Sequence, residues 1–136
     1  MSANGSPRTG NHIQQGILDE EHLGRMTLGD RLVEREVLEI FVRHSATTLD
    51  LILGCIADRD PAAAAAAAHT MIGSARGIGA WRVAQAAERL ERALNTGGDE
   101  QQWGEAIAAL KAANLEANTA IGARLADPAN RTAECT

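Results

Sequence analysis

The stretch HTMIGSARGIGA, residues 69–80, places a histidine on a helix surface that otherwise carries mostly small side chains. On a helix, positions three, four and seven residues from His69 share its face. These neighbours are Ala65, Ala66, Ile72, Gly73 and Arg76. Glycine inside a helix costs about 1 kcal/mol relative to alanine, so Gly73 indicates a place where something must come close. Apolar positions on the opposite side predict the buried stripe and leave His69 facing water: Ala64, Ala68, Met71, Ala75 and Ile78.

Signals on both sides of His69 mark the ends of its helix. Asp60 can cap a helix that has Pro61 at its first position, where proline loses no hydrogen bond and already has a helical φ. The seven alanines that follow are strong helix formers and carry the helix into the histidine. Gly77 and Gly79 end the helix or bend it tightly.

Two further helices are predicted downstream. The first has an apolar stripe at Ala80, Val83, Ala84, Ala87, Leu90 and Leu94. Asp99 and Gln102 have the spacing of a capping box and start the last long helix, which Asp127 and Pro128 end. The apolar positions of this last helix are Trp103, Ile107, Leu110, Ala117, Ile121 and Leu125.

Upstream, the sequence predicts a short helix and a long one. Asp19 can cap a short helix that runs to about Thr27. After Gly29 and Asp30, apolar residues recur with a 3.6-residue period to about Ala57, which predicts a long amphipathic helix. The predicted apolar face of this helix is Leu32, Val33, Val37, Ile40, Phe41, His44, Thr48, Leu51, Ile52 and Cys55.

Together these elements predict an all-α protein, an antiparallel four-helix bundle with a short extra N-terminal helix. Short connections make neighbouring helices antiparallel, and an alanine-rich chain with 2% aromatic residues suits closely packed helices better than a sheet. The predicted organisation is a flexible leader over residues 1–16, the helical bundle over 17–126 and a flexible tail over 127–136.

Composition narrows the class of partner. The 136 residues carry a formal net charge of −5, which disfavours nucleic acid and anionic membranes, so proteins are the expected partners. Cys55 and Cys135 lie far apart in sequence and are read as free thiols. There is no signal-like start, and no apolar run approaches the roughly 20 residues that span a bilayer. We therefore expect a soluble, cytoplasmic protein.

The chemistry available to His69 is that of a lone nucleophilic imidazole, which can accept a phosphoryl group. No companion nucleophile for a hydrolase triad and no further ligands at metal spacing lie near it, so no metal site is predicted. His12 and His22 are read as surface residues, and His44 as a histidine at the edge of the core. On spacing and composition alone, an incidental exposed histidine remains an equal reading of His69.

A family resemblance favours the functional reading of His69 over the incidental one. His69, Met71, Gly73, Ser74, Ala75, Ile78, Gly79 and Ala80, continuing through Val83, Ala87, Leu90 and Glu91, closely resemble the signature of histidine-containing phosphotransfer (HPt) domains. Residues 29–31 and 36–41 look like the preceding helix of that family, and Asp60-Pro61 like its turn. The resemblance covers roughly Leu18 to Leu125.

The resemblance implies roles for the residues around the histidine. His69 would be phosphorylated on Nε2, with Nδ1 held by a hydrogen bond for which Glu91 is the matching residue; a solvated glutamate is the alternative. Gly73 would admit the partner, and Ser74 would keep the contact close or simply pack against its own helix. The chain departs from the family at Ile72, where a lysine is usual. Ile72, with Ala65 and Ala66, then suggests an apolar docking surface.

Arg76 is the candidate to replace the missing lysine, because it lies almost in line with His69; a solvated arginine is the alternative. The resemblance further implies partners that are response-regulator receiver domains and a sensor or hybrid histidine kinase. Mg²⁺ belongs to the receiver domain, and the chain is expected to need no cofactor of its own. Without a nucleotide-binding motif it would be a transfer intermediate with no ATP-dependent kinase activity. A monomer is the expected state.

The competing hypothesis is a helical adaptor that binds a kinase or receiver domain without accepting phosphate. Exposure of the His69 ring separates the two hypotheses, since a ring buried by its own chain could not take part in a relay.

Overall fold

The computed structural model describes residues 17–127, so the predicted leader and nearly all of the predicted tail, including His12 and Cys135, lie outside the described residues. Five helices are described: α2 Glu20–Met26, α3 Arg31–Ala57, α4 Pro61–Ile78, α5 Trp81–Asn95 and α6 Glu100–Leu125. Residues 17–127 contain no β-strand, so this part of the chain is all-helical as predicted.

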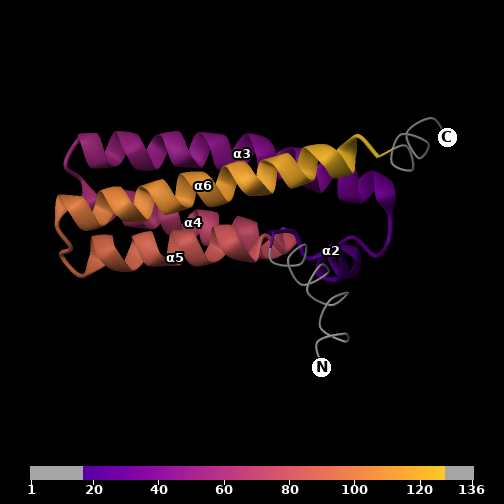
Figure 1. Ribbon diagram of the computed structural model, residues 1–136, viewed down its shortest axis with the longest axis horizontal. Helices are drawn as coiled ribbons and strands as arrows, with labels where there is room; N and C mark the ends of the chain where they lie inside the picture. The colour runs from indigo at the N-terminus through magenta and orange to yellow at the C-terminus, as the bar shows by residue number, and fades with distance from the viewer. Residues whose placement is uncertain (1–16, 128–136) are drawn as a thin grey trace, which may run out of the picture.

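The four long helices lie side by side with nearly aligned axes (Figure 1). The α3–α4 and α5–α6 connections lie at one end of the molecule and the α4–α5 connection at the other, where α2 also lies. Helix α4 packs against both α3 and α5, and α6 packs against α5 and α3. Because α4 is flanked on two sides, a narrow face of it remains open to solvent.

The capping residues act where the sequence places them. The carboxylate of Asp30 accepts hydrogen bonds from the backbone N–H groups of Leu32 and Val33, and that of Asp60 accepts one from Ala63. The capping box of Asp99 and Gln102 forms in full. These caps satisfy backbone donors that a helix leaves unpaired, which explains why the helices begin there.

Gly79 ends α4 in a left-handed conformation with φ 80°, which glycine adopts without strain. The backbone N–H of Asp19 donates to the carbonyl of Gly79 at 2.9 Å. A Cβ atom at position 79 would lie 2.8 Å from the Cβ of Asp19, so glycine is required for this close approach. The result is that the segment before α2 is fixed against the α4–α5 turn.

A second contact fixes the same segment. The Oδ2 atom of Asp19 accepts a hydrogen bond of 2.9 Å from the indole Nε1 of Trp81, and the ring of His22 lies 4.9 Å from the Trp81 ring, centroid to centroid. Partial burial raises the pKa of Asp19, but hydrogen bonds from Trp81 and the His22 backbone, with the charges of His22 and Arg25, lower it by more. His22 is therefore half-buried against Trp81, and its reading as a surface residue was wrong.

The buried face of α3 differs from the prediction. The buried residues of this helix are Glu34, Leu38, Phe41, Ser45, Thr48 and Ile52. Four predicted core residues are exposed instead: Leu32, Val33, Ile40 and Leu51. The apolar residues of α3 occupy two adjoining stripes, and periodicity alone does not decide which stripe faces the neighbouring helices. His44 is exposed on the second stripe, so its assignment to the core edge was also wrong.

The buried carboxylate of Glu34 has a partner on α6. Both of its oxygens accept hydrogen bonds from Arg124, at 2.6 Å from Nε and 3.1 Å from Nη2. These bonds, against partial burial, hold the pKa of Arg124 above its ordinary value. Arg124 also lies 3.3 Å from Glu20, so one guanidinium links α2, α3 and α6.

Helix α3 also qualifies the expectation about membranes. By length and composition it could cross a bilayer, since an 18-residue window has a mean hydropathy of 1.3. One such helix is weak evidence for a membrane span. A core helix of a soluble domain passes the same test, and α3 buries Leu38, Phe41 and Ile52 against its neighbours.

Candidate functional site

The site begins with the placement of His69 on α4. Four of the alanines that precede it, at positions 64, 65, 67 and 68, are buried and seat the helix in the bundle. His69 lies on the solvent-facing side of the helix, and its side chain is 73% exposed. Because the helix is rigidly capped at Asp60 and packed along the alanines, the ring is presented to solvent from a fixed backbone.

Glu91 on α5 determines how the ring is held. Its Oε2 atom lies 3.0 Å from Nδ1 of His69, and its side chain is 26% exposed. A carboxylate accepts hydrogen bonds and donates none, so this contact places the ring proton on Nδ1. The lone pair of a neutral ring is then on Nε2, the atom that does not contact Glu91.

An ion pair between α4 and α5 lies beside this hydrogen bond. Arg76 on α4 forms an ion pair with Glu88 on α5, through Nη2 and Oε2. Glu88 and Glu91 are three residues apart and therefore share one face of α5. Helices α4 and α5 are thus joined at this surface by two polar contacts, His69 to Glu91 and Arg76 to Glu88.

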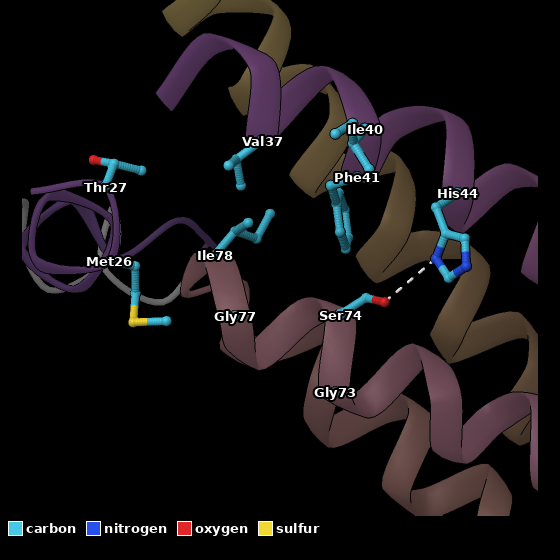
Figure 2. Close-up of a pocket in the computed structure, with 10 residues that line it drawn as sticks. All are labelled: Met26, Thr27, Val37, Ile40, Phe41, His44, Gly73, Ser74, Gly77 and Ile78. Carbon is cyan, nitrogen blue, oxygen red and sulfur yellow. Dashed lines mark hydrogen bonds between the residues drawn. The ribbon is translucent and has the colours of Figure 1, made fainter. Parts of the chain in front are cut away.

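On the other side of His69, a groove separates α4 from α3. Its volume is about 310 Å³, and its lining comes from three helices and one cap residue: Met26 of α2 with its C-cap Thr27, Val37, Ile40, Phe41 and His44 of α3, and Gly73, Ser74, Gly77 and Ile78 of α4 (Figure 2). The hydroxyl of Ser74 lies 3.3 Å from Nδ1 of His44, across the groove. Apart from this polar pair and Thr27, the side chains that line the groove are apolar.

Two glycines leave the α4 side of the groove open. A Cβ atom added at Gly73 or Gly77 would meet no atom within 4 Å apart from the nearby backbone of its own helix. The space above Gly73 is therefore unfilled by the chain itself, one helical turn from His69. Ser74 does not bond back to its own helix, as one reading of the sequence expected, but contacts His44.

The structure corrects the predicted docking surface. Ala66 is exposed, as expected, but Ala65 and Ile72 have relative exposures of 5% and 4% and belong to the core. These two residues lie about 40° to 60° around the helix from His69, on the side of α4 where Arg76 contacts α5. Sequence spacing places both residues on the histidine face. It does not show how much of that face a neighbouring helix covers.

Sequence reasoning missed two parts of this surface, Glu88 and the groove beside His44. A signal for Glu88 was present, since it precedes Glu91 by three residues on the helix that pairs with α4. The groove had no comparable signal, because its shape depends on which stripe of α3 faces α4.

Comparison with known families identifies the class of protein. The sequence model of the family described as the Hpt domain matches residues 36–120, more than half of the chain. No curated protein and no solved structure matches the chain significantly. The chain therefore belongs to the Hpt domain family.

Membership in this family carries a function in general terms. Hpt domains take part in histidine phosphotransfer within phosphorelays, where they interact with receiver domains and histidine kinases, and they are generally soluble. An exposed histidine beside an acidic side chain, on a helical surface with a neighbouring groove, is chemically suited to this activity.

Proposed function

We propose that this protein carries a phosphoryl group on Nε2 of His69 and relays it between receiver-domain aspartates in a multistep two-component phosphorelay. It works as a monomeric, antiparallel four-helix bundle in the cytoplasm, with a sensor or hybrid histidine kinase upstream. It is a transfer intermediate and does not use ATP. The observation that carries this proposal is the His69 ring, 73% exposed and bonded through Nδ1 to Glu91.

The contact with Glu91 favours attack by Nε2. The Nε2 lone pair forms a bond to phosphorus as the bond from phosphorus to the aspartyl oxygen of the receiver breaks, and the aspartate leaves as a carboxylate. Nδ1 keeps its proton, so the phosphorylated ring carries a positive charge. The carboxylate of Glu91, 3.0 Å away, stabilises that charge and lowers the barrier to transfer.

Docking of the receiver domain uses the groove between α2, α3 and α4. The groove offers exposed apolar side chains, among them Met26 at 58% and Ile40 at 48% exposure, beside an α4 surface bared by Gly73. A receiver placed there brings its own acidic residues and Mg²⁺ close to His69. Positioning and charge then supply most of the catalysis, which a bundle with one phosphate-accepting histidine can provide.

Arg76 supplies positive charge in place of the lysine that is usual at position 72. Ile72 is buried, so a cation at that position would have to leave the core to reach the phosphoryl group. Arg76 is exposed and two helical turns from His69, on nearly the same line along α4.

Transfer from a phosphorylated receiver domain tests the proposal. The wild-type protein, His69→Gln and His22→Gln are incubated with the labelled receiver, and acid-labile, base-stable label on the chain is measured. Label is expected on the wild type and on His22→Gln, which keeps His69, but not on His69→Gln. Binding of the receiver without label on any chain would overturn the relay and support the non-transferring adaptor.

A further inference from the structure

The ion pair between Arg76 and Glu88 lies on the surface that carries His69, and the transfer chemistry described above does not use Glu88. We propose that Glu88 is a positioning residue: it holds the Arg76 guanidinium beside His69 while the ring is free, and yields it when the ring is phosphorylated. This inference rests on the proposed function and concerns its energetics, because the exchange affects how firmly His69 keeps a phosphoryl group.

Helix geometry brings the guanidinium toward the histidine. Residues seven apart on a helix are offset by about 20°, and side chains tilt toward the helix N-terminus, so Arg76 leans toward His69. The partner of Arg76 is Glu88, and the partner of His69 is Glu91. Side chains three residues apart begin about 5–6 Å from each other, so the two contacts are neighbours on the face that α5 turns to α4.

Phosphorylation changes which anion Arg76 prefers. In the unmodified protein its side chain, 57% exposed, is neutralised by Glu88. A phosphoryl group brings roughly two negative charges and oxygens arranged for bidentate bonding with a guanidinium. The phosphoryl group therefore competes with the carboxylate of Glu88 for the Arg76 guanidinium, and Arg76 moves from Glu88 to the phosphoryl group.

Competition between Glu88 and the phosphoryl group for Arg76 predicts the direction in which each substitution changes the stability of phosphorylated His69. Each bond that Arg76 makes to Glu88 must be given up before it can bind the phosphoryl group. Removing the charge of Glu88 therefore makes Arg76 more available and stabilises phosphorylated His69. Removing Arg76 destabilises phosphorylated His69 and abolishes the effect of changing Glu88.

The equilibrium between a phosphorylated receiver and this protein measures the competition. Glu88→Gln is expected to shift the label toward His69 by about threefold, the size expected for an exposed ion pair, and Arg76→Ala to shift it toward the receiver. In the Arg76→Ala background, Glu88→Gln is expected to change nothing. Glu116→Gln is the matched control, because it breaks an α5–α6 pair of similar exposure, with Arg82, away from His69.

A second measurement needs no receiver domain. Phosphoramidate phosphorylates histidine directly. The phosphoryl group of the phosphorylated protein is then titrated with pH and followed by ³¹P NMR. The phosphoryl group of Glu88→Gln is expected to titrate at lower pH than that of the wild type, and that of Arg76→Ala at higher pH. A shift in Glu88→Gln that persists without Arg76, or no shift in either measurement, would overturn the inference. Failure of receivers to transfer, with the ³¹P shifts as expected, would overturn the relay alone.

Discussion

Nδ1 of His69 on α4 lies 3.0 Å from Oε2 of Glu91 on α5, and the two residues are 22 positions apart in the sequence. The contact therefore depends on the packing of the two helices, which buries Ala68 on one side and Ala87 and Leu90 on the other. The bundle thus determines which nitrogen of the exposed ring is free to react.

Replacement of Glu91 is the direct test of this contact. In Glu91→Gln the amide oxygen still accepts a hydrogen bond from Nδ1 but adds no charge, so the transfer rate is expected to fall about 3- to 10-fold. In Glu91→Ala the ring also loses its fixed orientation, so the transfer rate is expected to fall by about 10- to 100-fold. Single-turnover transfer from a phosphorylated receiver measures both. Equal rates for all three proteins would mean that Glu91 is a solvated residue.

A substitution at Gly73 tests docking of the receiver without a loss of folding stability. A leucine at position 73 would enter open space above α4, so the folded state is expected to be at least as stable as the wild type. The same side chain would occupy the surface that a receiver must approach, and transfer is expected to fall by about 10- to 100-fold. Gly122→Leu is the control, because a Cβ there also meets nothing, on α6. Similar transfer by the two variants would exclude close approach at Gly73.

The helix boundaries were the most predictable part of the molecule. Asp30, Asp60 and the Asp99 capping box act through hydrogen bonds within a few residues, so their signals are local and can be read from the sequence. The left-handed Gly79 is local in the same sense. His69 could be identified as a candidate because the residues of its motif lie within one short stretch of the chain, from His69 to Glu91.

The orientation of the helices was less predictable, because it depends on contacts between distant segments. The sequence pattern places Ile72 on the docking surface, yet it is buried, and it places Ile40 in the core, yet it lines an open groove. Both residues are apolar and lie at the boundary of a helix face. Their exposure depends on where the neighbouring helix lies, which sequence periodicity does not specify.

Asp19 predicts a dependence of stability on acid pH. Its pKa is lowered in the folded protein below the ordinary value of 3.8, so its charge stabilises the fold above that pH, and the contribution is lost as the pH falls through the folded pKa. Asp19→Asn keeps a capping side chain but loses the charge, whereas Asp19→Ala loses both and is expected to cost about 1 kcal/mol at pH 7.

Urea denaturation at several pH values measures this effect. The midpoint for Asp19→Asn is expected to lie below that of the wild type at pH 7, and the two midpoints are expected to converge below about pH 3.8. A difference that stays constant down to pH 2 would show that the charge of Asp19 contributes nothing and that its contacts with Trp81 are those of a neutral group.

Breaking the pair of Arg124 and Glu34 is expected to lower stability by a large amount without affecting transfer through His69. Glu34 is 7% exposed, and Arg124 supplies two of its hydrogen bonds, so Arg124→Gln leaves a buried carboxylate without its charged partner. The expected loss is about 3 kcal/mol in the free energy of unfolding. Arg82→Gln, which breaks an exposed pair with Glu116, is expected to cost less than about 1 kcal/mol.

Replacing both partners of the pair shows whether the stability lost in Arg124→Gln comes from an unpaired buried charge or from lost packing. Replacing both partners, in Glu34→Leu with Arg124→Leu, removes the buried charge and is expected to recover most of the stability lost in Arg124→Gln. Calorimetric or denaturant unfolding provides the measurement. Transfer through His69 is expected to remain close to wild type in each folded variant, because neither residue lines the groove or contacts the His69 ring. A double variant less stable than Arg124→Gln would show instead that the ion pair contributes net stability to the junction of α2, α3 and α6.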